Sequence, residues 1–396
     1  MKRRTFLKTA AAVPVPGLFG APTAPLVDPE TAKDWRKRWE ETILRTRYRR
    51  YCDTAMGEGI GWLMSPFLNG FYYGYMATRD PHWLELLSDW AEAWIKRGVQ
   101  EPDGFTGWPQ EDGPLYTDSL LGEAMGLRPL VLAAGESLKT PGLEKAWGVR
   151  ARAWLKLAGQ VFEKWDSRAC WREVKDGGLW VVPEFGIDRT SGKWTAGYES
   201  RKTSGFSNPD NKENEIAGWM LAMYEVTGKP VYRERAGEWF RLMRSRMKLR
   251  EDGKYFVWNY WEPAGPWDYK SDGTPKHWVG VHPNGGYYGI DVSSIVEAFE
   301  HGLVFQRGEI DRLIATNRDF MWNRQMRPAR FQRIDGGQPD PRWKDSPGVL
   351  WTALAPYDET LRKIFLANHD PADWGGLAGT PWALAKQIRE AGGGRG

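Results

Sequence analysis

"YEVTGKPVYRERAGEWF", residues 224–240, is the stretch that decides the fold of this 396-residue chain. It carries an aromatic residue, then Thr-x-x-Pro, a second aromatic residue, and a Trp seven positions after that residue. The stretch "YMATRDPHWLELLSDW", residues 75–90, carries the same frame. Because Pro suits the first turn of a helix, each stretch predicts two helices joined by a tight turn.

Further helical pairs lie on both sides of these two stretches. The apolar spacing predicts pairs over 116–165, 211–248, 287–323 and 348–390, for roughly eleven or twelve helices in all. A helical pair of this kind buries its apolar stripe only by stacking on neighbouring pairs. The count predicts a closed ring of six hairpins, in which one helix of each pair lines a central funnel.

The hairpin count, the Trp-rich loops and the turn at 224–240 resemble the six-hairpin (α/α)6 toroid superfamily of carbohydrate-active enzymes. That superfamily contains glycoside hydrolases, polysaccharide lyases that act on uronates, and some epimerases. The resemblance implies an all-α fold, with a single catalytic toroid domain over residues 30–392. The fold does not give the function, which must be inferred from the residues of the site.

The composition excludes several functional classes. Lys and Arg number 55 against 51 Asp and Glu, so the net charge of +4 does not favour nucleic-acid binding. The two cysteines, Cys52 and Cys170, predict no zinc motif and leave open whether they form a disulfide. The chain has 24 Trp residues, and Trp is rarely fully buried. We therefore expect some indole rings in a cleft, where they suit the flat apolar faces of sugar rings, although any single Trp is equally compatible with core packing.

The first residues, "MKRRTFLKTAAAVPVPGLFGAPTAP", read as an export signal over 1–25. Arg3 and Arg4 precede Thr-Phe-Leu-Lys and a mildly apolar stretch, which is typical of twin-arginine signals. No other segment reaches 18 uncharged apolar residues, so the sequence predicts no membrane span. We expect a periplasmic or secreted protein that crosses the membrane already folded.

Four long segments interrupt the helices, at 101–118, 183–215, 255–269 and 333–348. Each mixes Gly, Pro, carboxylates and Trp, and loops this long in a compact domain are usually functional. In a helical ring they would gather at one mouth of the funnel. The predicted substrate-binding indoles in these loops are Trp108, Trp258, Trp261 and Trp267.

The stretch "HWVGVHPNGGYYGIDV", residues 277–292, is the candidate catalytic corner. It places His282 and Tyr287 just before a predicted helix, where free backbone N–H groups favour anions. A His–Tyr pair beside an anion site can take a proton from the carbon next to a uronate carboxylate, while a second group protonates the leaving glycosidic oxygen. Tyr288 is a further catalytic candidate, and His277 a substrate-binding one. The alternative is that His282 caps a turn and both tyrosines belong to the core.

A lyase also needs donors for the substrate carboxylate, and amide and guanidinium groups supply them. "GFSNPDNKENE" offers Asn208, Asn211 and Asn214 at a helix start, and Arg201 precedes it. The resemblance implies an Asn beside a His at this place, whereas the neighbours of Asn211 are Asp and Lys. Ordinary capping of the helix is the competing explanation.

Glycoside hydrolysis is the alternative activity, and it needs one protonated and one ionised carboxyl group. The loop and helix-start candidates are Glu111, Asp112, Asp118, Glu213, Glu215, Glu262 and Asp268. Among them Glu262 stands nearest to several Trp residues, and apolar surroundings favour the protonated form of a carboxyl group. A non-catalytic glycan-binding protein is the second alternative.

No cofactor is predicted. The sequence contains neither a phosphate-binding loop nor HExxH. Asp335, Asp340 and Asp345 could supply oxygen ligands to a structural Ca²⁺, but the EF-hand spacing is missing. The predicted ligand is a polysaccharide or oligosaccharide, and the oligomeric state stays open.

Overall fold

The computed structural model describes residues 29–39, 41, 49–182, 185–196, 205–250, 253–344 and 346–368. The predicted export signal, Arg201 and Asp345 lie outside these ranges. The predicted pairs at 116–165, 211–248 and 287–323 lie within them, the pair at 348–390 is described only as far as residue 368, and most of the four mouth segments are described.

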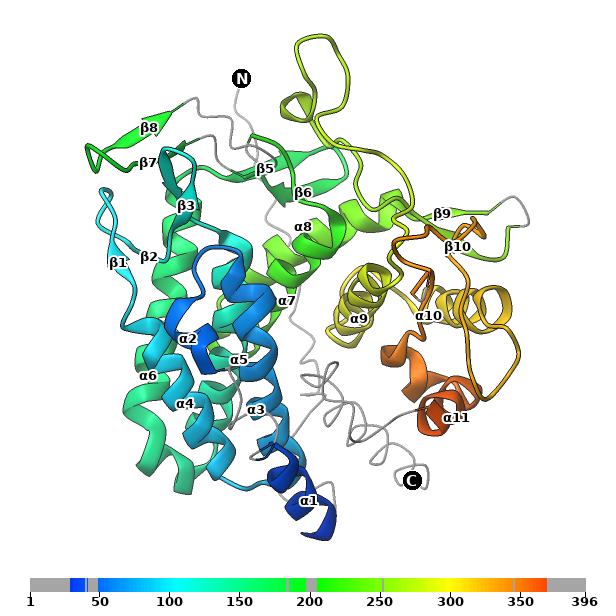
Figure 1. Ribbon diagram of the computed structural model, residues 1–396, viewed down its shortest axis with the longest axis horizontal. Helices are drawn as coiled ribbons and strands as arrows, with labels where there is room; N and C mark the ends of the chain where they lie inside the picture. The colour runs from blue at the N-terminus through cyan, green and yellow to red at the C-terminus, as the bar shows by residue number, and fades with distance from the viewer. Residues whose placement is uncertain are drawn as a thin grey trace, which may run out of the picture.

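Antiparallel helical hairpins build the described part of the chain (Figure 1). Their bounds are α3 Ser65–Thr78 with α4 His82–Ile95, α5 Leu120–Lys139 with α6 Pro141–Ser167, α7 Asp210–Thr227 with α8 Pro230–Arg246, α9 Gly286–Glu300 with α10 Arg307–Ala315, and the 3-10 helix η6 Thr352–Tyr357 with α11 Glu359–Asn368. Shorter helical segments are α1 Pro29–Trp39, α2 Arg50–Thr54, η3 Ile60–Met64, η4 Pro266–Asp268 and η5 Thr316–Met321.

The first members of these hairpins form an inner layer. Helix α3 packs on α5, α5 on α7, α7 on α9, and α9 on η6, while α4, α6 and α8 each pack on the helix that precedes them. An inner series of helices with an outer helix beside each is the arrangement of an (α/α) toroid. The all-α toroid prediction is therefore confirmed, with five of its six hairpins in the described residues.

The two stretches that share the Thr-x-x-Pro frame have the same joint geometry. Thr78 Oγ1 donates to Gly74 C=O at 2.8 Å and accepts from Asp80 N–H at 3.2 Å. Thr227 Oγ1 repeats this, donating to the carbonyl four residues before it at 2.6 Å and accepting from the amide two residues after it at 3.3 Å. In both joints the residue after Thr has a left-handed backbone, which ends the helix. The Thr hydroxyl therefore caps each helix end, and this explains the repeated frame.

The core lies between the two helical layers. Leu221, Met223 and Trp239 are at most 1 % exposed, as the helical spacing at 211–248 predicts. Trp90, at the equivalent position of the other frame, is also buried, and its ring meets that of Phe71 edge-on with 5.2 Å between centroids. The Trp of the frame is thus a core residue that joins inner and outer helices.

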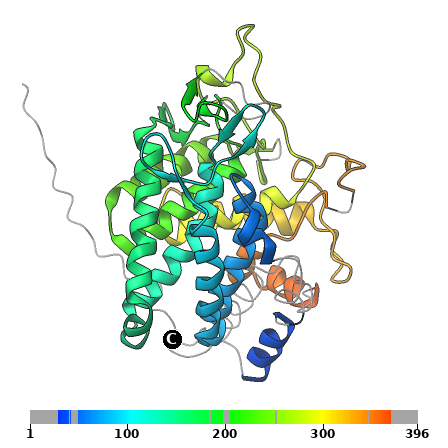
Figure 2. The ribbon, with the colours of Figure 1, turned by 60° about the vertical axis from the view of Figure 1, so that its left-hand side comes forward.

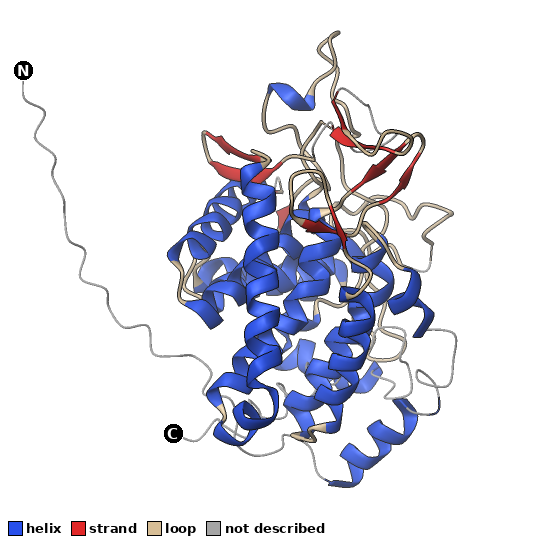
Figure 3. Cartoon of the chain, turned by 90° about the vertical axis from the view of Figure 1, so that its left-hand side faces the viewer, coloured by secondary structure: helices blue, strands red, loops and turns tan. Residues whose placement is uncertain are grey.

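Short strands and long loops gather at one end of the helices (Figures 2 and 3). The strands are β1 Val99–Gln100, β2 Thr106–Gly107, β3 Gln110–Asp112, β4 Leu115–Thr117, β5 Trp171–Val174, β6 Gly177–Trp180, β7 Phe185–Asp188, β8 Trp194–Ala196, β9 Lys248–Leu249 and β10 Phe256–Val257. They pair antiparallel as β1–β2, β5–β6, β9–β10 and the four-stranded order β3-β4-β7-β8. These pairings satisfy the backbone groups of segments that the sequence predicts only as loops.

Two further sequence questions are answered by the described residues. Cys52 and Cys170 are both free and buried, so they do not form a disulfide with each other. No described helix is long and apolar enough to cross a membrane.

Candidate active site

Tyr260 joins the starts of two inner helices at the mouth of the ring. Its backbone N–H donates to Gly280 C=O at 2.8 Å, and its C=O accepts from Asp210 N–H, the first residue of α7, at 3.0 Å. The buried indoles of Trp258 and Trp261 fix the loop on either side, donating to Asp291 Oδ2 and Ser207 C=O, both at 2.9 Å. The loop at 255–269 and the stretch at 277–292 are therefore held together over α7 and α9.

Two histidines and a second tyrosine surround Tyr260. The ring centroid of Tyr260 lies 4.7 Å from that of His282, 5.3 Å from that of Tyr287 and 6.0 Å from that of His277. His282 and Tyr287 also meet each other, edge-on at 4.6 Å. We call Tyr260, His277, His282 and Tyr287 the mouth cluster. Three of its four members were predicted from the sequence, and Tyr260 was not.

Local hydrogen bonds set opposite tautomers in the two histidines. Nδ1 of His282 lies 3.0 Å from the backbone N–H of Asn284, which can only donate, so the proton of neutral His282 sits on Nε2. Nδ1 of His277 lies 3.1 Å from the carbonyl oxygen of Trp278, which can only accept, so the proton of neutral His277 sits on Nδ1. Nε2 of His282 is therefore a donor, and Nε2 of His277 is an acceptor.

Burial shifts the pKa of two members of the mouth cluster, His282 and Tyr260, towards their uncharged forms. It lowers the pKa of His282 to about 4, with the nearby charges of Arg342, His277 and Arg333 adding to the effect. Burial raises the pKa of Tyr260 above its usual value, and Tyr287 and the Glu58 carboxylate act in the same direction. Near neutral pH, Tyr260 and His282 are thus two neutral proton donors beside one possible proton acceptor, His277.

Two exposed indoles flank His282. Trp278 is 50 % exposed and Trp343 is 37 % exposed, and both ring centroids lie 6.2 Å from that of His282. Exposed indoles on opposite segments suit the apolar face of a sugar ring. Sequence reasoning missed both residues, and local composition could not have found them, because Trp261 stands among polar, Gly and Pro neighbours and is buried.

An ion pair lies next to the mouth cluster, between the first turn of α7 and the turn that precedes η3. Lys212, in the first turn of α7, lies 2.8 Å and 3.0 Å from the two carboxylate oxygens of Glu58. Trp62 Nε1 donates to the same carboxylate at 2.7 Å. Both partners remain partly exposed, so this pair supplies a cation and a carboxylate to the same mouth.

Tyr288, Asn208 and Asn214 make structural contacts, whereas no contact is found among the described residues for the side-chain oxygen of Asn211. Tyr288 is 2 % exposed, and its hydroxyl accepts from the backbone N–H of His282 at 2.9 Å. Asn208 donates to Glu213 at 2.9 Å, and the buried Oδ1 of Asn211 has no hydrogen-bond partner. Asn214 bridges Asp291 and the indole of Trp239. Tyr288 therefore positions His282 rather than facing a substrate.

The predicted indoles differ in exposure. Trp108 and Trp261 are 0 % exposed and Trp258 is 2 % exposed, so they have no surface to offer a sugar. Trp108 instead donates to Trp94 C=O at 3.0 Å and packs in the core. Trp267 is half-buried and folds back over Gly265.

The predicted hydrolase carboxylates are scattered. Glu262 accepts from Asn259 at 2.6 Å and lies 3.7 Å from Lys248 Nζ. Asp268 is buried and accepts from Ser207 and Ala264, and Glu111 pairs with Arg189. Burial raises the pKa of Glu213 to about 8, but its side chain is 1 % exposed. These carboxyl groups do not come together at the mouth cluster.

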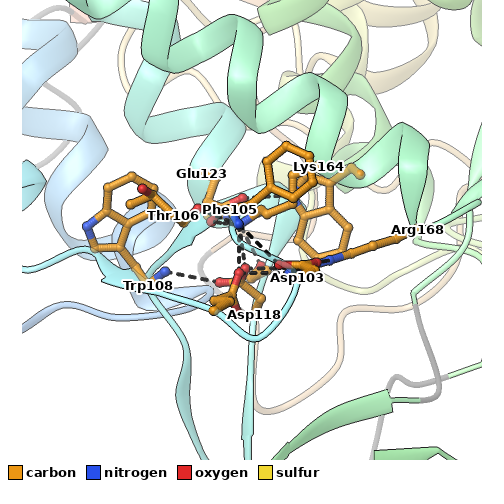
Figure 4. Close-up of polar contacts among 12 residues, drawn as sticks. Asp103, Phe105, Thr106, Trp108, Asp118, Glu123, Lys164 and Arg168 are labelled. Carbon is orange, nitrogen blue, oxygen red and sulfur yellow. Dashed lines mark hydrogen bonds and ion pairs between the residues drawn. The ribbon is translucent and has the colours of Figure 1, made fainter. Parts of the chain in front are cut away.

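Asp118 belongs to a buried ionic network at the α5–α6 side of the mouth (Figure 4). Lys164 Nζ lies 2.5 Å from Asp118, 2.5 Å from Glu123 and 3.4 Å from Glu101. Arg168 contacts Glu101 at 2.8 Å, Asp103 at 2.8 Å and Asp118 at 3.4 Å. We call these six residues the Lys164 network.

The described residues hold no group of three or more His, Cys, Asp or Glu arranged for a metal ion. Two of the predicted calcium ligands are used otherwise. Asp335 pairs with Arg333 at 2.7 Å, and Asp340 pairs with Arg342 at 2.8 Å. We therefore assign these carboxylates to ion pairs that order the loop at 333–348.

No family model matches the sequence, and no curated protein matches it. Among solved structures the chain is similar to a D-mannose isomerase, with 14% identity, 94% of this chain and 87% of that chain covered, and a TM-score of 0.49. It is similar to an α-1,6-mannanase of a Salegentibacter species, with 11% identity, 91% and 98% covered, and a TM-score of 0.46. It is also similar to a polysaccharide lyase, with 12% identity, 92% and 97% covered, and a TM-score of 0.46. At these values the likenesses carry no conclusion about activity, so we infer function from the residues of the site.

Proposed function

We propose that this protein is an enzyme that cleaves a uronate-containing polysaccharide or oligosaccharide by β-elimination at the mouth cluster. The observation that carries the proposal is the pair of Nδ1 contacts that give His277 and His282 opposite tautomers beside Tyr260. Elimination needs one proton acceptor and at least one proton donor in the same site. The exposed Trp278 and Trp343 beside them would hold the sugar ring.

In the proposed reaction, Nε2 of His277 takes the proton from C5 of the uronate. The electrons of the C5–H bond form the C4=C5 double bond, and the C4–O bond breaks. The leaving oxygen takes a proton from the Tyr260 hydroxyl, which burial keeps protonated. Return of the proton from His277 to Tyr260 through solvent restores the starting state.

Charge that develops on the uronate carboxylate needs preorganised donors. The Nε2–H of His282 is one such donor, and its tautomer is fixed by the backbone of Asn284. The Lys212 ammonium and the exposed Arg342 guanidinium place positive charge around the same mouth. In this proposal His282 polarises the substrate and His277 is the base. The roles predicted from the sequence are the other way round, with His282 catalytic and His277 substrate-binding.

Glycoside hydrolysis is the second candidate, and one observation favours it. Burial raises the pKa of Glu215, an inner-helix carboxyl group that is still partly exposed, as a general acid requires. Non-catalytic glycan binding would need only Trp278 and Trp343. We place β-elimination first because the proton-transfer groups and the exposed indoles lie together.

One assay separates the three activities. The protein is incubated with a panel of uronate polymers, and the absorbance of a conjugated unsaturated uronate is recorded together with new reducing ends. Growth of the absorbance supports elimination, and new reducing ends without it support hydrolysis. Binding without either product supports a glycan-binding protein. Loss of the absorbance in His277→Ala, but not in His82→Ala at the other end of the ring, would assign the reaction to the mouth cluster.

Export by the twin-arginine route remains a prediction from Arg3 and Arg4. It is compatible with a polysaccharide substrate, which a cell meets outside its cytoplasm.

A further inference from the structure

Four inner helices each contribute one polar side chain to a second cluster. The residues are Tyr73 of α3, Arg128 of α5, Glu215 of α7 and Glu297 of α9. Arg128 Nη2 donates to Glu297 Oε2 at 2.6 Å, and Arg128 Nη1 lies 4.0 Å from Glu215 Oε2. We call these four residues the luminal cluster.

The Arg128–Glu297 pair spans α7 on the inner side of the ring. Arg128 and Glu297 belong to helices that both pack on α7, and they meet over Gly218 of that helix. A Cβ added at Gly218 would lie 2.8 Å from Arg128 Nη1 and 3.4 Å from Glu297 Oε2. The absence of a side chain at Gly218 therefore leaves room for the guanidinium, and the pair faces the lumen of the ring.

The side chains of the luminal cluster are largely buried but keep part of their surface exposed. Burial raises the pKa of Glu215, with Arg128 opposing and Glu297 reinforcing the shift, and burial also raises the pKa of Tyr73. Yet the side chains of Arg128, Glu215 and Glu297 keep exposed fractions of 19%, 21% and 24%. The described residues therefore cover these side chains only in part.

The luminal cluster lies next to the mouth. Glu215 is one helical turn beyond Asn211 and Lys212 on α7, and Lys212 pairs with Glu58 at the mouth. If Trp278 and Trp343 hold a saccharide, its terminal sugar would therefore contact the luminal cluster.

We propose that the luminal cluster is a subsite for a neutral sugar ring at the end of the saccharide chain, so that the substrate enters the ring end first. The inference rests on the proposed function in taking a saccharide as the ligand. Carboxyl and guanidinium groups side by side bind vicinal hydroxyls through paired donors and acceptors, and Tyr73 offers an aromatic face. Because one guanidinium faces two carboxyl groups, the cluster favours hydroxyl donors over a carboxylate.

The test measures binding of D-mannose, D-glucose and D-glucuronate by isothermal titration calorimetry, without any turnover. We expect at least one neutral sugar to bind the wild type more tightly than D-glucuronate does. Glu297→Gln and Gly218→Ala should weaken that binding by about 10- to 100-fold, because a charge-assisted hydrogen bond or its geometry is lost. Gly159→Ala is the matched control, since an added Cβ there meets nothing within 4 Å.

Each variant is also melted, to show that it is folded. Tyr73→Phe, which removes only a hydroxyl group, serves if either of the other variants fails to fold, and it should weaken binding in the same direction. The proposal is overturned if no neutral sugar binds the wild type, if D-glucuronate binds best, or if folded luminal variants bind as the wild type does.

The experiments can contradict β-elimination at the mouth cluster without contradicting the luminal subsite, and the reverse. Sugar binding that depends on Glu297 without any unsaturated product would remove the elimination mechanism and keep the luminal subsite. If elimination is observed, the products at low conversion decide the mode of attack. Short products released from the start support entry by the chain end, whereas a rapid fall in polymer viscosity would overturn it.

Discussion

The Lys164 network and the mouth cluster lie at the same end of the ring and have opposite character. The side chains of Lys164 and Glu123 are 0 % exposed, and every charge in the network has an oppositely charged partner within hydrogen-bond or ion-pair distance. The mouth cluster is half-buried, burial lowers the pKa of its His282 and raises that of its Tyr260, and two exposed indoles flank it. The Lys164 network is therefore closed by its own contacts, whereas the mouth cluster has an exposed surface beside it.

The difference follows from what each region must do. Buried charges are tolerated only when they are paired and hydrogen-bonded, so the Lys164 network is closed by its own contacts. A reacting site needs groups with free donor and acceptor positions, which the Nε2 atoms of His277 and His282 provide. The two regions therefore should respond differently to substitution, the first through stability and the second through turnover.

The largest expected effect is on stability. Lys164→Met leaves Glu101, Asp118 and Glu123 without their shared cation, and removing one partner of a buried ion pair costs about 3–5 kcal/mol. Urea unfolding followed by circular dichroism measures the free energy of unfolding. Lys145→Met, at an exposed position of the same helix, should change it by less than about 0.5 kcal/mol. Equal effects of the two substitutions would show that the network is not structural.

The next effect is on turnover. His277→Ala should lower kcat by about 10²–10⁴ while leaving the melting temperature nearly unchanged, because a proton acceptor is lost. His282→Gln should retain more activity than His277→Gln, since an amide can replace an N–H donor but cannot act as a base. Comparing the two Gln variants on the uronate polymer checks the roles. Equal losses would contradict the assignment of tautomers.

The third expected effect is a pH dependence of stability that arises from the Lys164 network. The unfolded pKa of Glu101 and Glu123 is near 4.5, and burial, with the nearby Asp118, raises the folded pKa to about 7 and about 8. Since the folded protein holds these protons more tightly, their stabilisation is complete below pH 4.5 and is lost as the pH rises through 7 and 8. The melting temperature should therefore fall between about pH 5 and about pH 9.

Glu101→Gln should flatten that fall, because one titrating group is removed. Glu213 and Asp291 have a folded pKa raised to about 8 and contribute in the same direction, so the difference between wild type and variant is the quantity to measure. His282 changes the stability in the opposite direction. Its pKa is lowered to about 4, so its stabilisation is present above pH 6.5 and is lost as the pH falls towards 4. If the melting temperature of Glu101→Gln falls with pH as steeply as that of the wild type, Glu101 does not contribute to the pH dependence.

A smaller effect is expected at the exposed indoles. Trp278→Ala and Trp343→Ala should each raise KM several-fold, by about 1 kcal/mol of lost stacking, with little change in kcat. Tyr269→Ala, at another exposed aromatic side chain of the same loop region, is the control. If kcat falls instead and KM is unchanged, these residues position the histidines rather than the sugar.

The smallest effect on the folded protein is expected at the N-terminus. Replacing Arg3 and Arg4 together with Lys should leave stability and turnover unchanged and retain the protein in the cytoplasm. Cell fractionation checks the location. Normal export of the double variant would contradict the twin-arginine prediction.

The helical hairpins could be predicted from the sequence because their signals are local. The Thr-x-x-Pro frame specifies a helix end, and the Thr78 and Thr227 hydroxyls make the same contacts in both copies. Exposure of a Trp is not local. Trp261 and Trp278 lie in similar sequence surroundings, but one is 0 % and the other 50 % exposed.

The site could be predicted only where its residues are adjacent in sequence. His282 and Tyr287 were found because they share one stretch, whereas Arg128 and Glu297 meet only through the ring of helices. The tautomer of each histidine depends on one backbone contact, which no residue pattern records. Asp118 was one of seven carboxylate candidates for the alternative hydrolase activity, and its ion pairs with Lys164 and Arg168 could not be predicted because these partners are far from it in sequence.

The uneven exposure of the indoles gives the protein an optical reporter. Trp278 and Trp343 are the two Trp side chains among the exposed large hydrophobic residues of the described chain, while most described indoles are buried. A collisional quencher such as acrylamide should therefore extinguish a red-shifted minority of the intrinsic fluorescence. A saccharide that covers Trp278 and Trp343 would shield that minority, so occupancy of the mouth can be followed without labels and in variants that have lost all turnover.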